Sequence, residues 1–598
     1  MPVASRFAAL LVCTLFALPM PHAANAAAPV AKAVSASQEL SDLANRFIDT
    51  SFDLNPMQAT SVTGDDRYAD KFVVNLTPAF RERESAFLKE MSRALKKIPS
   101  AQLTANDRLT YDVLDYQIRQ RLDGTKFDFY RTPFNQFYSL PLTMVQFAST
   151  QGAQPFRTVK HYEQFLQRLE GFPEWVDAAI ANMRDGMQHK VVQPKILMTR
   201  VLTQLKTQIV TDPDRSGFMA PVHKFPATVE EADRARLTAA YRQMTADKII
   251  PAFQRLHDFV EKEYLPKCRD SSGLGATPNG AAKYAFLVRQ TTTTDMKPEQ
   301  IHQLGLQEVA RIRLEMEKVR SQVGFSGDLQ AFIDSIATDP KLRPFKTEEE
   351  VIEAYRVIQH KVEPTLEKLF ARIPRSKLEI RPEPEITRAT AAAHYAIGAP
   401  DGSRPGVFYA PVRDATTYTT PKMTSLFLHE ALPGHHFQGS LAQESNLPRA
   451  RRFTWFTAYG EGWGLYAESL GNELGVYDDP YQYLGMLLAE MHRAIRLVVD
   501  TGMHAKGWSR EKAVAYSLQN EGGQEADAIQ EVERYMAIPG QALAYKIGQL
   551  KIRELRTRAE KKLGARFDLK AFHAQILNDG SLPLAVLEKK VNRWMAQQ

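Results

Sequence analysis

The segment from residue 420 to residue 470 constrains this chain most, because it gathers three histidines and four glutamates around a proline–glycine pair. It reads TPKMTSLFLHEALPGHHFQGS and, after a polar connection, TAYGEGWGLYAESL. Two imidazoles, a carboxylate farther along and a further carboxylate beside the first histidine are the side chains of a zinc hydrolase. The candidate residues are His429, Glu430, His435, His436, Glu461 and Glu468.

The spacing of these histidines does not fit one regular helix. In the motif H-E-x-x-H the second histidine lies about 400° around the helix and about 6 Å along it from the first, so both rings can reach one metal ion. In a regular helix His435 would lie about 240° from His429, and His436 would lie about 10 Å farther along the axis. The Pro433-Gly434 pair interrupts such a helix, because proline lacks a backbone donor and glycine tolerates unusual dihedral angles.

We therefore expect a two-residue bulge that returns His435 to the position of a second metal ligand. The alternative is a helix that ends at Leu432 and is followed by two surface histidines. Glu430 would point about 100° away from the ligand face, which suits a general base for zinc-bound water. Thr420 and Pro421 are expected to cap and open this helix.

The rest of the chain predicts a mainly α-helical fold. Apolar residues recur at helical spacing from Leu40 to Ile48, and the pattern stops at Asn55-Pro56. A second stripe runs from Val309 to Val323, and 598 residues suffice for two lobes. The turn-rich stretch 268–280 is a candidate lobe boundary. Residues 377–386 and 406–413 read as short strands that form a small β element.

The N-terminus predicts export. Residues 1–26 resemble a signal peptide, with Arg6, an apolar run from Phe7 to Leu18 and the cleavage motif Ala24-Asn25-Ala26. The run is too short to span a bilayer, so we expect no stable membrane insertion. Cys13 lacks a preceding small residue, which argues against a lipid anchor. After a linker at 27–36, only Cys268 remains, and we expect a periplasmic or secreted protein without an intrachain disulfide.

Charge and motifs exclude several other classes of protein. The net charge of +7 is spread over the chain without a Lys/Arg block, so we expect no nucleic-acid partner. No phosphate-binding loop or G-x-S-x-G motif is present. Gly460, Gly462 and Gly464 lie in a helical segment rich in aromatic residues, and close helix packing explains them better than a glycine-rich loop.

Four motifs carry a family resemblance: HEALPGHHFQ, EGWGLYAE, RAIRLVVDTGMH and RYMAIPGQALAYKIG, in that order. They resemble the bacterial domain-of-unknown-function 885 family from about residue 38 to the C-terminus. That family is grouped with the gluzincin metallopeptidases, which are related to thermolysin, angiotensin-converting enzyme and the oligopeptidases. Dipeptidyl peptidase III is a related precedent with one extra residue between its histidines, where this chain has two.

The resemblance implies a two-lobed, metallopeptidase-like fold over residues 37–598, with a small β element beside the active-site helix. It also implies one zinc ion per chain, held by His429, His435 and Glu461, and a peptide or oligopeptide substrate. Glu468 would hydrogen-bond a ligand from the second shell. In gluzincins an edge strand just before the histidine helix, here 406–413, pairs with the extended substrate. The alternative is a small structural hairpin.

A donor for the oxyanion is expected from the C-terminal motifs, where His504, Tyr535 and Tyr545 are candidates. Arg496, Asp500 and His504 lie at i, i+4 and i+8, so Asp500 could orient the imidazole while Arg496 holds Asp500. The resemblance favours Tyr545, with Tyr535 second.

The resulting hypothesis is an exported zinc metallopeptidase that uses Glu430 as general base. One alternative is a zinc amidase that acts on a cell-wall or other non-protein amide. Another is a non-catalytic peptide-binding relative, which the presence of Glu430 argues against. The sequence leaves open the oligomeric state, the substrate preference, endo- or exopeptidase action, and cobalt or manganese in place of zinc.

Overall fold

The computed structural model describes residues 35–598 except 151, 389–390 and 399–403. It is mainly helical with one small sheet, which confirms the expected fold class. The predicted signal peptide and all but the last two residues of the linker lie outside the described residues. Within the described ranges, no helix is both long and apolar enough to cross a membrane.

The N-terminal helices follow the predicted periodicity. The apolar stripe from Leu40 to Ile48 is buried on α1, which ends at Leu54, and Pro56 then occupies the first turn of α2. These helices share a core with α3 and α4. Their bounds are α1 Ala36–Leu54, α2 Pro56–Thr63, α3 Pro78–Lys97 and α4 Ala105–Gly124.

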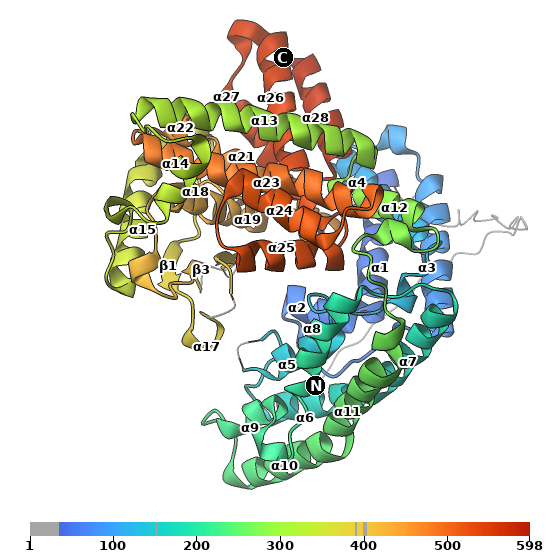
Figure 1. Ribbon diagram of the computed structural model, residues 1–598. Helices are drawn as coiled ribbons and strands as arrows, with labels where there is room; N and C mark the ends of the chain where they lie inside the picture. The colour runs from blue at the N-terminus through green and yellow to red at the C-terminus, as the bar shows by residue number, and fades with distance from the viewer. Residues whose placement is uncertain (1–34, 151, 389–390, 399–403) are drawn as a thin grey trace, which may run out of the picture.

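A group of helices at the bottom of Figure 1 forms one lobe with its own hydrophobic core. Aromatic side chains are frequent in this core, which Phe165, Phe172 and Phe253 help to fill. The helices are α5 Leu140–Ala148, α6 Val159–Leu169, α7 Phe172–Gln188, α8 Lys195–Lys206, α9 Ala220–His223, α10 Glu231–Met244 and α11 Ile250–Phe259.

The larger lobe is built around the long helix α23, against which α13 and α18 pack. The predicted stripe is buried on α13 from Val309 to Val319, and its last member, Val323, is partly buried just after the helix ends. The helices up to the histidine segment are α12 Gly280–Thr292, α13 Pro298–Gln322, α14 Leu329–Ile336, α15 Glu348–Val362, α16 Leu366–Leu369 and α17 Glu385–Arg388. Those after it begin with α18 Pro421–Glu430, α19 His435–Glu444, α20 Arg449–Arg452, α21 Thr457–Glu468, α22 Gly471–Leu474 and α23 Pro480–Lys506. The chain ends with α24 Arg510–Glu521, α25 Glu525–Ala537, α26 Ala544–Leu563, α27 Leu569–Leu577 and α28 Leu584–Gln597.

The chain passes from the hydrophobic core of the lower lobe to that of the larger lobe near the turn-rich stretch 268–280. The last buried residue of the lower core is Tyr264, and the core of the larger lobe takes up the chain again at Tyr284. The larger lobe also takes in Leu109, Val113 and Leu197 from earlier helices, so the lobes are not strictly consecutive in sequence.

The small sheet has the order β1-β3-β2, with β1 Leu378–Pro382, β2 His394–Ala396 and β3 Gly406–Ala410. β1 runs parallel to β3, and β2 runs antiparallel to it. The expectation that 406–413 forms an edge strand is therefore wrong, because β3 is hydrogen-bonded on both sides. The sheet nevertheless lies beside the histidine helices, since β2 and β3 both contact α19.

Candidate metal centre

The helix that carries His429 stops earlier than predicted. α18 ends at Glu430, residues 431–434 form an irregular connection with a cis peptide bond before Pro433, and α19 begins at His435. The expected two-residue bulge is thus a complete break between two helices, because Pro433 has no N–H with which to continue the ladder. Thr420 precedes Pro421, but its side chain does not cap the helix.

Gly434 allows the chain to fold back onto α18. A Cβ atom built at Gly434 would lie 1.8 Å from the backbone oxygen of His429 and 2.3 Å from that of Leu428. No side chain fits at this distance, so glycine is required where the connection passes the end of α18. The fold-back brings the rings of His429 and His435 together, with centroids 4.7 Å apart.

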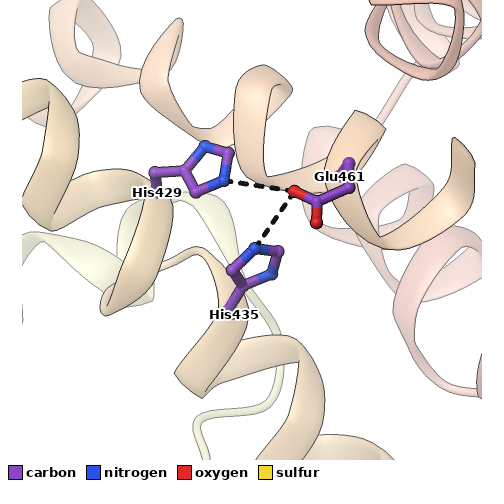
Figure 2. A group of neighbouring side chains, drawn as sticks. All are labelled: His429, His435 and Glu461. Carbon is purple, nitrogen blue, oxygen red and sulfur yellow. Dashed lines mark ion pairs between the residues drawn. The ribbon is translucent and has the colours of Figure 1, made fainter. Parts of the chain in front are cut away.

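Glu461 completes a group of three possible metal ligands (Figure 2). One of its oxygens, Oε2, lies 3.4 Å from Nε2 of His429 and 3.4 Å from Nε2 of His435. In a tetrahedral zinc site with bonds of 2.0–2.1 Å, neighbouring ligand atoms are separated by about 3.3 Å. The spacing and the chemistry of the donors therefore fit zinc.

The other ring nitrogen of His429 is oriented by Glu468. Nδ1 lies 2.7 Å from Oε1 of Glu468, and Ser425 donates its hydroxyl to Oε2 at 2.5 Å. Both carboxylate oxygens are thus fixed, and the ring presents Nε2 to Glu461. In zinc sites, a histidine that binds the metal through one ring nitrogen usually donates its other ring N–H to a carboxylate. Ser425 was not predicted, although it lies four residues before His429 on the same helix face.

Glycines on α21 make the close approach of the helices possible. Gly464 faces the imidazole of His429, where a Cβ would come within 2.7 Å of the ring, and Gly462 packs against Gly548 of α26. The indole nitrogen of Trp463 donates to the carbonyl of Pro433 at 2.8 Å. The glycines thus serve helix packing, as expected, and Trp463 ties α21 to the connection between the histidine helices.

The electrostatics of the group favour a bound cation. Burial opposes a charge on His429, but hydrogen bonds to Glu461 and Glu468 outweigh it and raise the pKa of His429 to about 10. Burial likewise opposes the charge on Glu461, yet the two histidines hold the pKa of its carboxyl well below its usual range. The carboxylates therefore stabilise positive charge at the position that a metal ion would occupy.

His436 lies apart from this group. It is buried against the sheet, where its Nδ1 lies 3.2 Å from the hydroxyl of Tyr395. Burial lowers the pKa of His436 to about 4, so its ring is neutral. Of the two histidines at 435 and 436, only His435 joins Glu461.

Glu430 occupies the last turn of α18, next to His429, and its exposed fraction is 8%. Its charge acts on two neighbours, since it helps to raise the pKa values of His429 and of Tyr355. Glu430 is thus a nearly buried carboxylate beside the candidate ligands, and it is not one of the three grouped donors.

His504 is occupied elsewhere. The backbone N–H of Leu274 donates to its Nδ1, and its Nε2 donates to the carbonyl of Tyr535, both at 2.9 Å. Both nitrogens of this fully buried ring are therefore used, and burial lowers its pKa to about 4. The proposed role of His504 as an oxyanion donor is not compatible with this arrangement.

The predicted chain from Arg496 through Asp500 to His504 is also wrong. Asp500 accepts hydrogen bonds from the hydroxyl of Tyr284 and the backbone of Gly540. Arg496 instead donates to Tyr535 and to a glutamate of α25. Contacts from other helices thus replace the contacts that helical spacing suggested.

The two tyrosine candidates differ. The hydroxyl of Tyr535 is buried, accepts from Arg496 and donates to Glu531 at 2.8 Å. Tyr545 is half-buried, and the guanidinium of Arg496 lies 4.7 Å from the centre of its ring. Tyr545 lies one turn before Gly548, which packs on the helix of Glu461. Of the two tyrosines, Tyr545 is therefore the more exposed, whereas the hydroxyl of Tyr535 is already bound on two sides.

A second group of possible ligands in the described part of the chain lies on the surface of the lower lobe, at His257, Asp258 and Glu261. Gln254 and Lys262 already bond to Asp258 there. This arrangement is an ordinary solvated helix face.

The fold and the site together define a two-lobed helical protein with a buried His/His/Glu group beside a small sheet. The chain belongs to the family described as bacterial protein of unknown function (DUF885), which it matches over residues 56–591. A comparison with curated proteins finds no match.

Two solved structures share this fold. A protein of Colwellia psychrerythraea, described as a predicted lipoprotein, is 28% identical with a TM-score of 0.85, and the match covers 94% of this chain and all of that one. A second, from Shewanella oneidensis, is described as a predicted lipoprotein of unknown function. It is 21% identical with a TM-score of 0.72, and the match covers 93% of this chain and 99% of that one.

Proposed function

We propose that this protein is an exported, zinc-dependent peptidase. The observation that carries the proposal is the placement of one Glu461 oxygen 3.4 Å from both His429 Nε2 and His435 Nε2. That spacing, the carboxylate of Glu468 behind His429 and the unligated Glu430 beside it are the parts that hydrolytic zinc sites use. A structural zinc site has no need of Glu430.

His429, His435 and Glu461 would hold the metal. A zinc ion there would activate water and polarise the scissile carbonyl group. Glu430 would take the proton of the attacking water and return it to the leaving amine. Its position suits this role, because it adjoins His429 and is not one of the three grouped donors.

Tyr545 would donate its hydroxyl hydrogen to the developing oxyanion. Its ring lies against the guanidinium of Arg496, which Tyr535 and Glu531 hold in place. A fixed ring limits the motion of the hydroxyl and so favours a preorganised donor.

Export is supported by the signal-like residues 1–26 and by the description of both structural relatives as predicted lipoproteins. This chain differs from a typical lipoprotein in the residue that precedes Cys13, so we propose a mature protein that begins near Ala27 and is free in the periplasm. N-terminal sequencing tests this point. Retention of Met1, or recovery only with membranes, would contradict it.

The test of the function is hydrolysis of a mixed peptide library by the zinc-loaded wild type and by Glu430→Gln. General base catalysis contributes about 10²–10⁴-fold, so turnover should fall at least that far while zinc content and peptide binding persist. Glu473→Gln is a matched control, since Glu473 lies on α22, away from the histidine helices, and pairs with Arg556. Near-normal turnover in Glu430→Gln would refute the mechanism.

The same library separates the alternatives. A zinc amidase would leave all peptides intact and cleave a non-protein amide such as a muramyl peptide, again in a manner that depends on Glu430. A binding protein would retain peptides with the same affinity before and after the substitution and release no product.

A further inference from the structure

Trp455 is an unusually exposed aromatic side chain next to the candidate metal ligands. Its exposed fraction is 56%, and its ring centre lies 6.3 Å from that of His435. The indole lies against Gly460, the residue before Glu461, where a Cβ atom would come within 2.0 Å of the ring. Glycine at 460 therefore makes room for the indole in this position.

The segment around Trp455 is well anchored. Gln117 donates to the hydroxyl of Thr454 at 2.6 Å, and that hydroxyl donates to the carbonyl of Ala450. The backbone N–H of Phe456 donates to Ser581 at 2.9 Å. Hydrogen bonds thus fix Thr454 and Phe456 on either side of Trp455, while the indole itself remains exposed.

Ile397 is a second exposed apolar side chain, and it lies near the histidine helix α19. It follows β2, its exposed fraction is 43%, and its Cδ1 would lie 3.3 Å from a Cβ at Gly439. Gly439 comes four residues after His435 on α19, so the two share a helix face. Trp455 and Ile397 are both among the few large apolar side chains exposed in the described part of the chain. Trp455 lies beside His435, and Ile397 lies beside Gly439, one turn farther along α19.

We propose that Trp455 and Ile397 form an apolar subsite for side chains next to the scissile bond of the substrate. This inference rests on the proposed function. Exposed apolar groups that are held in place and concentrated beside reactive residues mark binding surfaces, because covering them with a ligand removes apolar area from water. The favoured substrates are peptides with leucine, phenylalanine or similar residues flanking the cleaved bond.

Peptide binding provides a test that does not depend on turnover. The zinc-loaded Glu430→Gln protein is titrated with two pentapeptides that differ only in having leucine or serine at the central positions. The chain has five tryptophans, so the same titration with an added Trp455→Phe substitution isolates the signal of Trp455. We expect the leucine peptide to bind at least 10-fold more tightly and to shift the Trp455 emission to shorter wavelength. Equal affinities, or an unchanged Trp455 signal, would overturn the inference.

Cleavage selectivity gives a second test. In Trp455→Ala and Ile397→Ser, kcat/KM for the leucine peptide should fall about 10- to 100-fold, with little change for the serine peptide and no loss of zinc. Leu314→Ser, which alters a 65% exposed leucine on α13, should keep the selectivity of the wild type. Equal losses for both peptides, or none, would refute the subsite. If the wild type cleaves neither peptide, the mixed peptide library decides the proposed function, and the fluorescence titration still decides the subsite.

Discussion

Gly434→Ala tests whether the fold-back of the chain positions the two histidines. The new Cβ atom would lie 1.8 Å from the carbonyl oxygen of His429, whereas real contacts of this kind are essentially never closer than 3.0 Å. The connection and the end of α18 must therefore separate by about 1.2 Å, a displacement of backbone that no rotamer change can avoid.

The displacement acts directly on the proposed metal ligands, because Gly434 adjoins His435 and its clash is with His429. Ligand distances in metal sites tolerate about 0.2 Å, so a shift of this size should remove one imidazole from its position. Loss of a residue that hydrogen-bonds a metal ligand typically lowers metal affinity by about 10–100-fold. We expect the zinc affinity of Gly434→Ala to fall by more than this. Overpacking should also destabilise the fold by about 1–3 kcal/mol.

The assay is competition for zinc with a chromophoric chelator, together with urea unfolding of the metal-free proteins. Gly217→Ala is the matched control, because the nearest atom to its new Cβ would lie at an ordinary 3.6 Å. Wild-type zinc affinity in Gly434→Ala would show that the close approach of the connection to α18 does not set the geometry of the ligands.

Three further predictions follow from individual contacts. Glu468→Gln should weaken zinc binding by about 10–100-fold in the same competition assay, and unchanged affinity would mean that Glu468 does not orient His429. Tyr545→Phe should lower kcat by about 10²–10³-fold with KM little changed, and a silent substitution in steady-state kinetics would remove Tyr545 from the oxyanion role. His504 and His573 are buried, and burial lowers the pKa of each to about 4. Histidine in the unfolded chain has a pKa near 6.5, so the unfolded chain binds more protons than the folded protein below that pH. As the pH falls from 6.5 to 4, each of these two histidines should therefore lower the free energy of unfolding by about 3 kcal/mol. Asp500, whose pKa burial raises to about 7, acts in the opposite sense. Urea unfolding from pH 6.5 to pH 4 should still show a net decrease in the free energy of unfolding. A free energy of unfolding that stays constant over this range would contradict the prediction.

Features set by local chemistry could be predicted from the sequence. The stripe on α1 and its end at Asn55-Pro56 follow from periodicity and from proline. β1 follows from the alternation of apolar and charged residues in LEIRP, and β3 from a short apolar run. β2 was missed, because three residues that pair with a neighbouring strand carry no periodic signal of their own.

In the candidate site, too, features set by local sequence could be predicted and features set by tertiary contacts could not. The proximity of His435 to His429 could be inferred from the Pro433-Gly434 pair, but the form of the connection could not, because a bulge and a break have the same sequence signal. Asp500 and His504 were paired by helical spacing, and both are bound by segments distant in the sequence. Likewise, the packing of Gly462 on Gly548 depends on tertiary structure alone.

Zinc stoichiometry tests the central claim most directly. Elemental analysis of purified wild type should find one zinc ion per chain, held by His429, His435 and Glu461. His435→Ala should lose the metal, whereas His436→Ala should retain it, since His436 faces Tyr395 and the sheet. Loss of zinc from His436→Ala with retention in His435→Ala, or a wild type that binds no zinc, would contradict the account.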